Sequence, residues 1–218
     1  RGHNYVIRII NRGGTTQEFD LYQENFSAWY INFGSQATPD RTITAPAVAE
    51  KCIAVGSYVT KNYWVDSQNR PQDYSWYGQI GRISQFSGRG PTLDGRIKPD
   101  VIAPGEWIAS ASSSDAIYAG EYIVYNGTQP LVNVRDDRWT NVEDGLVMNL
   151  GTSMAAPHVS GVAALLIQQY RELYGGDPTP AEIKALIMNS GLDQNGNVKT
   201  TKDNTYGCGK VDAYRAYV

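Results

Sequence analysis

The stretch from Gly151 to Leu166 limits the fold of this chain more than any other part of its sequence. A glycine and a threonine precede Ser153, and a run of small and apolar residues follows it. Because threonine is a good N-cap, the pattern predicts a turn that opens a buried helix at Thr152. Ser153 would then lie where free backbone N–H groups and the helix dipole stabilise a developing negative charge. That position suits a nucleophilic serine and part of an oxyanion hole.

Two residues later in this helix bear on the same hypothesis. Most serines near a helix start are simply N-caps, and this remains the competing interpretation of Ser153. Pro157 should leave the carbonyl of Ser153 without its helical partner and bend the first turns. At about 100° per residue, His158 points roughly 140° away from Ser153, so it cannot act as the base for that hydroxyl. We expect His158 to be a packed, hydrogen-bonded helix residue.

Composition excludes several classes of protein. The 218 residues suffice for one large or two small domains. A net charge of −3 gives no electrostatic footprint for nucleic acid or an anionic membrane, and no apolar run approaches a membrane span. Two cysteines, Cys52 and Cys208, are too few for a disulfide scaffold. We expect both to be free and Cys52 to be buried in a strand.

The first 41 residues read as β structure. Tyr5–Ile10, Phe19–Tyr22 and Trp29–Phe33 are short runs of β-branched and aromatic residues, separated by turn signals such as Gly13-Gly14. They predict an antiparallel, sandwich-like segment. The short apolar run Cys52–Val55 further on predicts a strand buried on both faces, and Ile108 begins a further strand.

Later segments predict a hairpin and two helices. Asn126-Gly127 should join strands at Tyr122–Tyr125 and Leu131–Val134, with a solvated acidic face (Asp136, Asp137, Glu143, Asp144) beyond them. The helix that carries Ser153 should extend to about Leu173, and Thr179 should cap a second helix that runs from Pro180 to Met188. The aromatic residues of 61–80 could form a ligand platform, but a loop that packs its own rings is the simpler interpretation.

The run Gly151–Leu166 as a whole resembles the nucleophile motif of the subtilisin-like serine peptidases, the subtilases. Three further segments resemble that family: Thr42–Ser57, Phe86–Gly105 and Gly207–Ala213. The resemblance implies an α/β fold with a parallel sheet flanked by helices, and it places the later strands of that sheet near Cys52–Val55, Ile97–Ile102 and Ile108–Ser110. It also implies that Ser153 is the nucleophile, that the backbone of Thr152 and Ser153 contributes to the oxyanion hole, and that Gly151 and Met154 adjoin the site. Asp100 lies at a position that flanks a weak cation site in some relatives. A hydrogen-bonded structural carboxylate is the simpler role for it, and we assign no metal ligand.

The resemblance covers residues 42–218, with 115–144 as an insertion and 1–41 as a β insertion found in some bacterial members. The chain would thus hold the later half of the peptidase domain. The family's catalytic Asp and His and its oxyanion Asn belong to an earlier segment, and His3 lacks the family's His context. The resemblance further implies a protein or peptide substrate, a secreted or cell-envelope location, no certain cofactor, and a structural calcium ion in the full-length protein.

Two functions remain open from the sequence. The chain is part of an active serine endopeptidase, or it is a non-catalytic module, either a degenerate subtilase or a β-sandwich binding unit. The intact run around Ser153 favours the enzyme. Because parallel sheets are rarely left uncovered, we also expect the open edge and apolar face of a half-domain to be covered. The cover would be the N-terminal half of the peptidase domain or a second copy of this chain.

Overall fold

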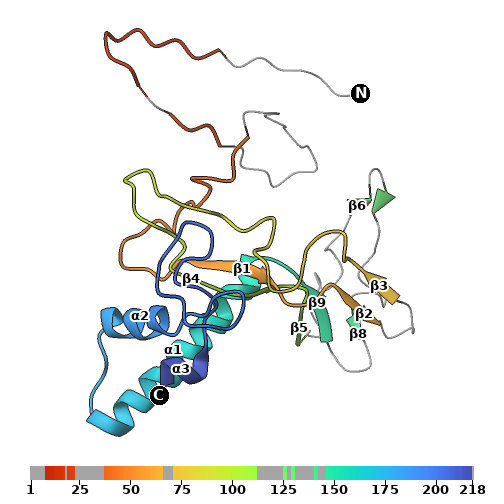
Figure 1. Ribbon diagram of the computed structural model, residues 1–218, viewed down its shortest axis with the longest axis vertical. Coiled ribbons are helices and arrows are strands. Elements are labelled where there is room, and N and C mark those ends of the chain that lie inside the picture. The colour runs from red at the N-terminus through yellow and green to blue at the C-terminus, as the bar shows by residue number, and fades with distance from the viewer. Residues whose placement is uncertain are drawn as a thin grey trace. The chain divides into compact units, whose positions relative to one another are not determined.

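A computed structural model describes residues 8–17, 19–22, 37–65, 71–111 and 146–217, and the backbone of three short strand segments between residues 125 and 141 (Figure 1). The chain divides into two units, Arg1–Thr38 and Pro39–Val218. The second unit contains every helix and strand of the described residues. It is an α/β structure with a parallel pair of strands packed against helices, as the sequence predicted.

Strands β1 (Val55–Val59) and β4 (Val101–Glu106) form the central parallel pair, in the register Val55 to Val101. Both begin later than predicted. Cys52 precedes β1; its thiol lies 3.1 Å from the Ala49 carbonyl, and the side chain is half-buried outside the sheet rather than buried in a strand. Ile97 is 42% exposed, and β4 begins only after Pro99, which has no N–H to donate to a ladder.

Irregular segments line both outer edges of this pair. On the β1 side, Val59 donates to the carbonyl of Arg82, and Ser84 donates to the carbonyl of Ser57. On the β4 side, Ile102 forms a parallel bridge with Lys210. The described part of the sheet is therefore two strands wide, with loops hydrogen-bonded along much of each edge.

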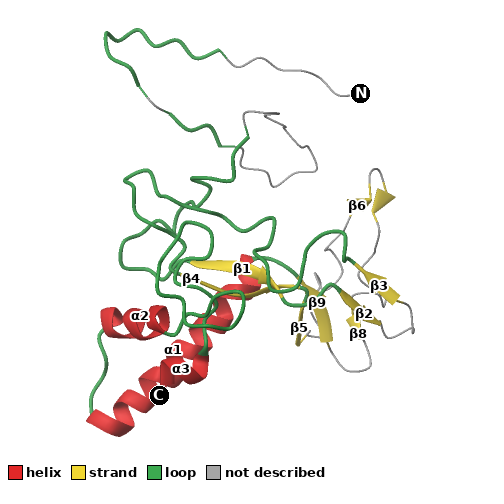
Figure 2. Ribbon diagram, in the orientation of Figure 1, coloured by secondary structure: helices red, strands yellow, loops and turns green. Residues whose placement is uncertain are grey.

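Three helices complete the core: α1 (Thr152–Tyr174), α2 (Pro180–Asn189) and α3 (Ala213–Tyr217) (Figure 2). Helix α1 packs on both central strands. Its buried residues follow the helical period, and they join residues of β4, α2 and α3 in one apolar cluster: Val101, Ala103, Ala155, Val159, Val162, Leu166, Ile183, Ile187 and Ala216. The predicted capping box of α2 is present, because Thr179 and Glu182 exchange side-chain-to-backbone hydrogen bonds. Helix α3 was not predicted.

The strand predicted at Ile108–Ser110 is present but does not extend the parallel sheet. Strand β5 (Ile108–Ala111) pairs antiparallel with β9 (Leu146–Asn149), which also pairs with β8 (Thr140–Asn141). The positive φ of 57° at Trp107 turns the chain between β4 and β5, and this turn explains why β5 does not continue the parallel sheet. A short hairpin is present as β6 (Tyr125–Asn126) and β7 (Gln129–Pro130), but Asn126 pairs with Gln129 and so belongs to a strand rather than to the predicted turn. The remainder of its predicted strands and the four acidic residues lie outside the described residues.

A small antiparallel hairpin, β2 (Tyr63–Val65) and β3 (Pro71–Asp73), carries part of the aromatic segment. Trp64 stacks on Tyr74 with ring centroids 5.3 Å apart, and Tyr74 contacts Trp107 at 4.4 Å. Trp107 is only 3% exposed. The rings thus pack against one another, as the simpler interpretation predicted.

The described residues of the first unit correct one expectation. Residues 8–10 and 19–22 form no strand, so the strand predictions there are wrong. Ile10 and Phe19 are 59% and 63% exposed, so neither is buried in a core formed by the described residues. Tyr5–Ile7 and Trp29–Phe33 lie outside the described residues.

Candidate active site

The turn before α1 is held by Gly151. Its N–H donates to the carbonyl of Gly105 at the end of β4 over 2.7 Å, and its own carbonyl accepts from Met154 N at 3.0 Å. Gly151, not Thr152, is the N-cap residue, and no side chain caps the helix, so the predicted Thr152 cap is wrong. The φ of 146° at this position favours glycine, and Thr152 therefore becomes the first helical residue.

Ser153 lies in the first turn of α1 and is exposed. Within the described residues, its hydroxyl and the backbone N–H groups of Thr152 and Ser153 make no hydrogen bond. These N–H groups are among the four that a helix start always leaves without an internal partner. The site therefore presents an accessible hydroxyl beside two unused donors at the positive end of a 23-residue helix.

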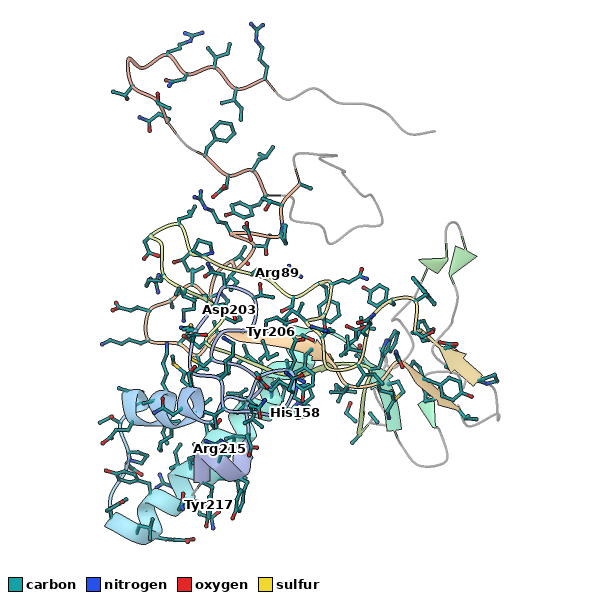
Figure 3. All side chains as sticks on the ribbon, in the orientation of Figure 1. Arg89, His158, Asp203, Tyr206, Arg215 and Tyr217 are labelled. Carbon is teal, nitrogen blue, oxygen red and sulfur yellow. The ribbon has the colours of Figure 1, made fainter. Side chains whose placement is uncertain are left out.

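His158 does not belong to this arrangement. Its Nδ1 lies 2.8 Å from the carbonyl oxygen of Met154, which holds the ring against its own helix (Figure 3). The predicted hydrogen bond is present, but the ring is exposed rather than packed because it projects from the flank of α1, beside the buried stripe and not within it. His3 lies outside the described residues, so the described part of the chain provides no histidine base for Ser153.

Met154 folds back over the start of the helix. Its sulfur lies 3.6 Å from the position that a β-carbon on Gly151 would take, and the side chain is half-buried. The thioether is thus within reach of both solvent and the turn that carries Ser153.

An open cavity of about 460 Å³ reaches the same turn, because Thr152 forms part of its wall. Residues 42–47, Val55 and residues 85–88 line much of the remainder. Val55 turns its N–H and C=O to the same side as Ser57 and Val59, and neither group has a hydrogen bond in the described part of the chain. The first residue of β1 therefore leaves an unfilled strand edge next to the candidate site.

Asp100 is a structural carboxylate, as the simpler interpretation predicted. It is 1% exposed and contacts the ammonium groups of Lys98, Lys184 and Lys202 at 2.6, 3.1 and 2.7 Å. Burial alone would raise its pKa, but hydrogen bonds from Lys202 and Lys98 and from the backbone of Ala54 lower the pKa to about 2. No group of three His, Cys, Asp or Glu side chains suited to a metal ion occurs among the described residues.

Two features of the site escaped sequence reasoning. Lys98 lies two residues before Asp100, a spacing that can put both side chains on one face of extended chain, whereas Lys184 and Lys202 arrive from distant segments. Gly105 carries the carbonyl that anchors Gly151, and its place right after the apolar strand was the available signal.

The comparisons with known proteins agree with this geometry. The model of the subtilase family (Peptidase_S8) matches residues 25–209. Serine protease AprX of Bacillus subtilis is 34% identical over 95% of this chain and 41% of its own length. Pyrolysin of Pyrococcus furiosus is 34% identical over 68% of this chain and 9% of its own length.

Among solved structures, the CspB protease of Clostridium perfringens aligns with a TM-score of 0.52 at 27% identity, over 84% of this chain and 29% of its own. The chain therefore spans less than half the length of each of these relatives. Because the family model matches most of its residues, the chain belongs to the subtilase (peptidase S8) family of serine proteases.

Proposed function

We propose that the protein is a serine endopeptidase in which Ser153 forms the acyl-enzyme. The observation that carries the proposal is the exposed hydroxyl of Ser153 at the start of α1, beside the unused N–H groups of Thr152 and Ser153. Oγ of Ser153 attacks the scissile carbonyl carbon while a base takes its proton. The N–H groups stabilise the resulting oxyanion. The amine leaves with a proton from that base, and water then releases the acyl group as a carboxylic acid.

We propose that three catalytic groups come from outside these 218 residues: the base, the acid that orients it, and the oxyanion amide. Residues 42–218 form the later half of the peptidase domain, with 115–144 as an insertion and 1–41 as a β insertion. The match to only 41% of the length of AprX supports the view that this chain corresponds to part of a longer peptidase. The catalytic unit is thus complete only when another segment contributes its side chains next to Ser153.

The N-terminal half of the peptidase domain is the proposed cover. It would fill the cavity that Thr152 lines and pair with the unfilled edge at Val55. Helix α1 supports the same conclusion, because Leu165 in the middle of the helix is 54% exposed, and Leu173 near its C-terminal end is 65% exposed. A large apolar side chain in the middle of a long helix is usually covered by a neighbour. A second copy of this chain is the alternative occupant.

The substrate is an unfolded or extended protein, and we place the enzyme outside the cytoplasmic membrane or in the cell envelope by family resemblance. Among the described residues, none of the helices is both long enough and apolar enough to span a bilayer.

The test is hydrolysis of a denatured protein substrate by the full natural polypeptide that contains this chain. Ser153→Ala should lower kcat by several orders of magnitude, because the members of a catalytic triad act as a unit. His158→Ala is the matched control on the same helix and should retain activity. Hydrolysis that survives Ser153→Ala, or a wild type that binds but never cleaves, would favour the alternative of a non-catalytic subtilase-like module.

A further inference from the structure

A second cavity, of about 510 Å³, lies away from the turn that carries Ser153. Its walls come from two parts of the chain, residue 82 beside β1 and residues 192–210 after α2. They carry five charged side chains: Arg82, Asp193, Lys199, Asp203 and Lys210. A volume of this size is typical of small-ligand sites, which range over about 300–1,000 Å³. None of these residues lines the 460 Å³ cavity beside the turn that carries Ser153.

The walls of this cavity are anchored by backbone hydrogen bonds. Leu192 and Lys210 exchange N–H···O bonds of 2.9 and 2.8 Å, and Lys210 also bridges to Ile102 of β4. On the opposite wall, the carbonyl of Arg82 accepts from Val59 N of β1 at 2.9 Å. The cavity is therefore built on the central sheet and keeps its shape without a ligand.

The two acidic groups in the wall are already engaged. Oδ1 of Asp193 accepts from the backbone N–H groups of Asn195 and Asn197 at 2.8 and 2.9 Å. Asp203 pairs with Lys199 at 2.8 Å, and its Oδ1 accepts from Tyr206 N at 2.7 Å (Figure 3 shows Asp203 and Tyr206). Asp203 is thus paired with a cation, whereas Asp193 keeps its negative charge with one oxygen held by backbone N–H groups. The three cationic and two anionic side chains of the wall leave a net charge of +1.

Arg82 and Lys210, in contrast, have no carboxylate partner within the described residues. The guanidinium of Arg82 contacts the side-chain oxygen of Gln194, which is neutral. The ammonium of Lys210 lies 5.1 Å from the ring centroid of Tyr58 and 3.2 Å from where a β-carbon on Gly81 would be. Gly81 directly precedes Arg82, so the ammonium of Lys210 reaches the wall that carries Arg82 from the opposite side of the cavity.

We propose that this cavity binds the anionic group of a small ligand, a phosphate or a carboxylate, between Arg82 and Lys210. A guanidinium offers paired N–H donors that fit a planar or tetrahedral oxyanion, and an ammonium adds a point charge from a second direction. The phenol of Tyr206 and the amide of Asn195 in the same wall provide neutral polar contacts. This binding site goes beyond the proposed peptidase activity and does not depend on Ser153.

The experiment is titration of the full natural polypeptide with inorganic phosphate, sulfate and succinate, followed by calorimetry at constant ionic strength set with potassium chloride. Saturable binding of at least one anion is expected. Arg82→Gln and Lys210→Met should each weaken it tenfold or more. Lys51→Gln removes a charge from an exposed position outside the cavity and should leave the affinity unchanged.

The three anions distinguish the chemistry, since preference for succinate identifies a carboxylate ligand and preference for phosphate or sulfate identifies a tetrahedral one. Far-ultraviolet circular dichroism checks that each variant is folded, and either variant alone suffices if the other is not. The absence of saturable binding by the wild type would overturn the proposal. Equal affinities in wild type and folded cavity variants, or preferential binding of calcium at the cavity, would overturn it as well.

Discussion

The backbone N–H of Gly151 donates to the carbonyl of Gly105 at 2.7 Å, so the end of strand β4 fixes the turn that presents Ser153. Gly105 is closely surrounded, so there is no room for a side chain at this position. A β-carbon on Gly105 would lie 2.8 Å from the Gly151 carbonyl and 2.4 Å from Oγ of Ser57. The position of the candidate nucleophile therefore depends on the absence of a side chain at residue 105.

Gly105→Ala should displace this turn. The added methyl group cannot be accommodated without a shift of backbone, and we expect a loss of stability of about 1–3 kcal/mol together with a larger loss of peptidase activity. Urea denaturation and kcat measurements check both effects. Gly176→Ala is the control, because no atom lies within 4 Å of its β-carbon position. A Gly105→Ala protein with unchanged activity would show that the turn is not held in this way.

The buried carboxyl group of Glu106 should make the folded protein less stable as the pH rises. Glu106 is 1% exposed, neither carboxylate oxygen has a hydrogen-bond partner among the described residues, and burial raises its pKa. A raised pKa means that its contribution is fully present below the unfolded-state pKa and is lost as pH rises through the folded-state pKa. Within that window the loss is about 1.4 kcal/mol per pH unit.

Glu106→Gln should remove this dependence. The variant should gain stability relative to the wild type at pH 8 and show little gain at pH 4, as measured by urea denaturation at both values. Glu50→Gln, at an exposed position, should not alter the pH profile. The prediction would be contradicted if the free energies of unfolding of the wild type and Glu106→Gln differed by the same amount at pH 4 and at pH 8.

Asp100→Asn should be strongly destabilising. It removes the anion from three ammonium groups, one of which, on Lys98, is only 3% exposed. Breaking a buried pair in this way costs about 3–5 kcal/mol. Asp94→Asn, which affects an exposed pair with Arg96, should change stability little. Equal melting temperatures for the two variants would exclude a structural role for Asp100.

Because of the Asp100 carboxylate, we expect the wild-type protein to lose stability at acidic pH. Because the folded pKa of Asp100 is depressed to about 2, its contribution is present above the unfolded-state pKa and is lost as pH falls from about 4 towards 2. Thermal melts between pH 5 and pH 2 should therefore show a loss that the Asp100→Asn variant lacks.

The elements that could be predicted from sequence are those whose signals are local. The period of α1 and the capping box of α2 are written into neighbouring residues, and both helices are present at the predicted positions. The N-cap of α1 was misplaced because the φ of Gly151 depends on its bond to Gly105, a contact across 46 positions in the chain.

Nonlocal contacts explain the other differences. The pairing of β5 with β9 follows from the turn at Trp107, which an apolar run alone does not reveal. The strand predicted at Phe19–Tyr22 had the right composition, but strands need a paired neighbour, and composition cannot provide one. The lysines around Asp100 come from residues 98, 184 and 202, and only the first could be inferred from spacing.

Oxidation of Met154 should inhibit the complete enzyme. Its half-buried thioether lies against the turn at Gly151, and the sulfoxide would add a polar oxygen there. Peroxide should slow hydrolysis at least severalfold, and Met154→Ala should resist this loss. Met188, which lies in α2 away from the turn, offers the comparison Met188→Leu, which should remain sensitive. Equal peroxide sensitivity of the wild type and Met154→Ala would count against the placement of Met154.

The most direct test of the account is the site of covalent labelling by a fluorophosphonate. The full natural polypeptide should gain one phosphonyl group, which mass spectrometry of its peptides should locate on Ser153, because an activated serine beside oxyanion donors reacts selectively. Ser153→Ala should abolish the label, and Ser160→Ala, about two turns further along the same face of α1, should retain it. A label on another serine, or a label that persists in Ser153→Ala, would contradict the assignment of Ser153 as the nucleophile.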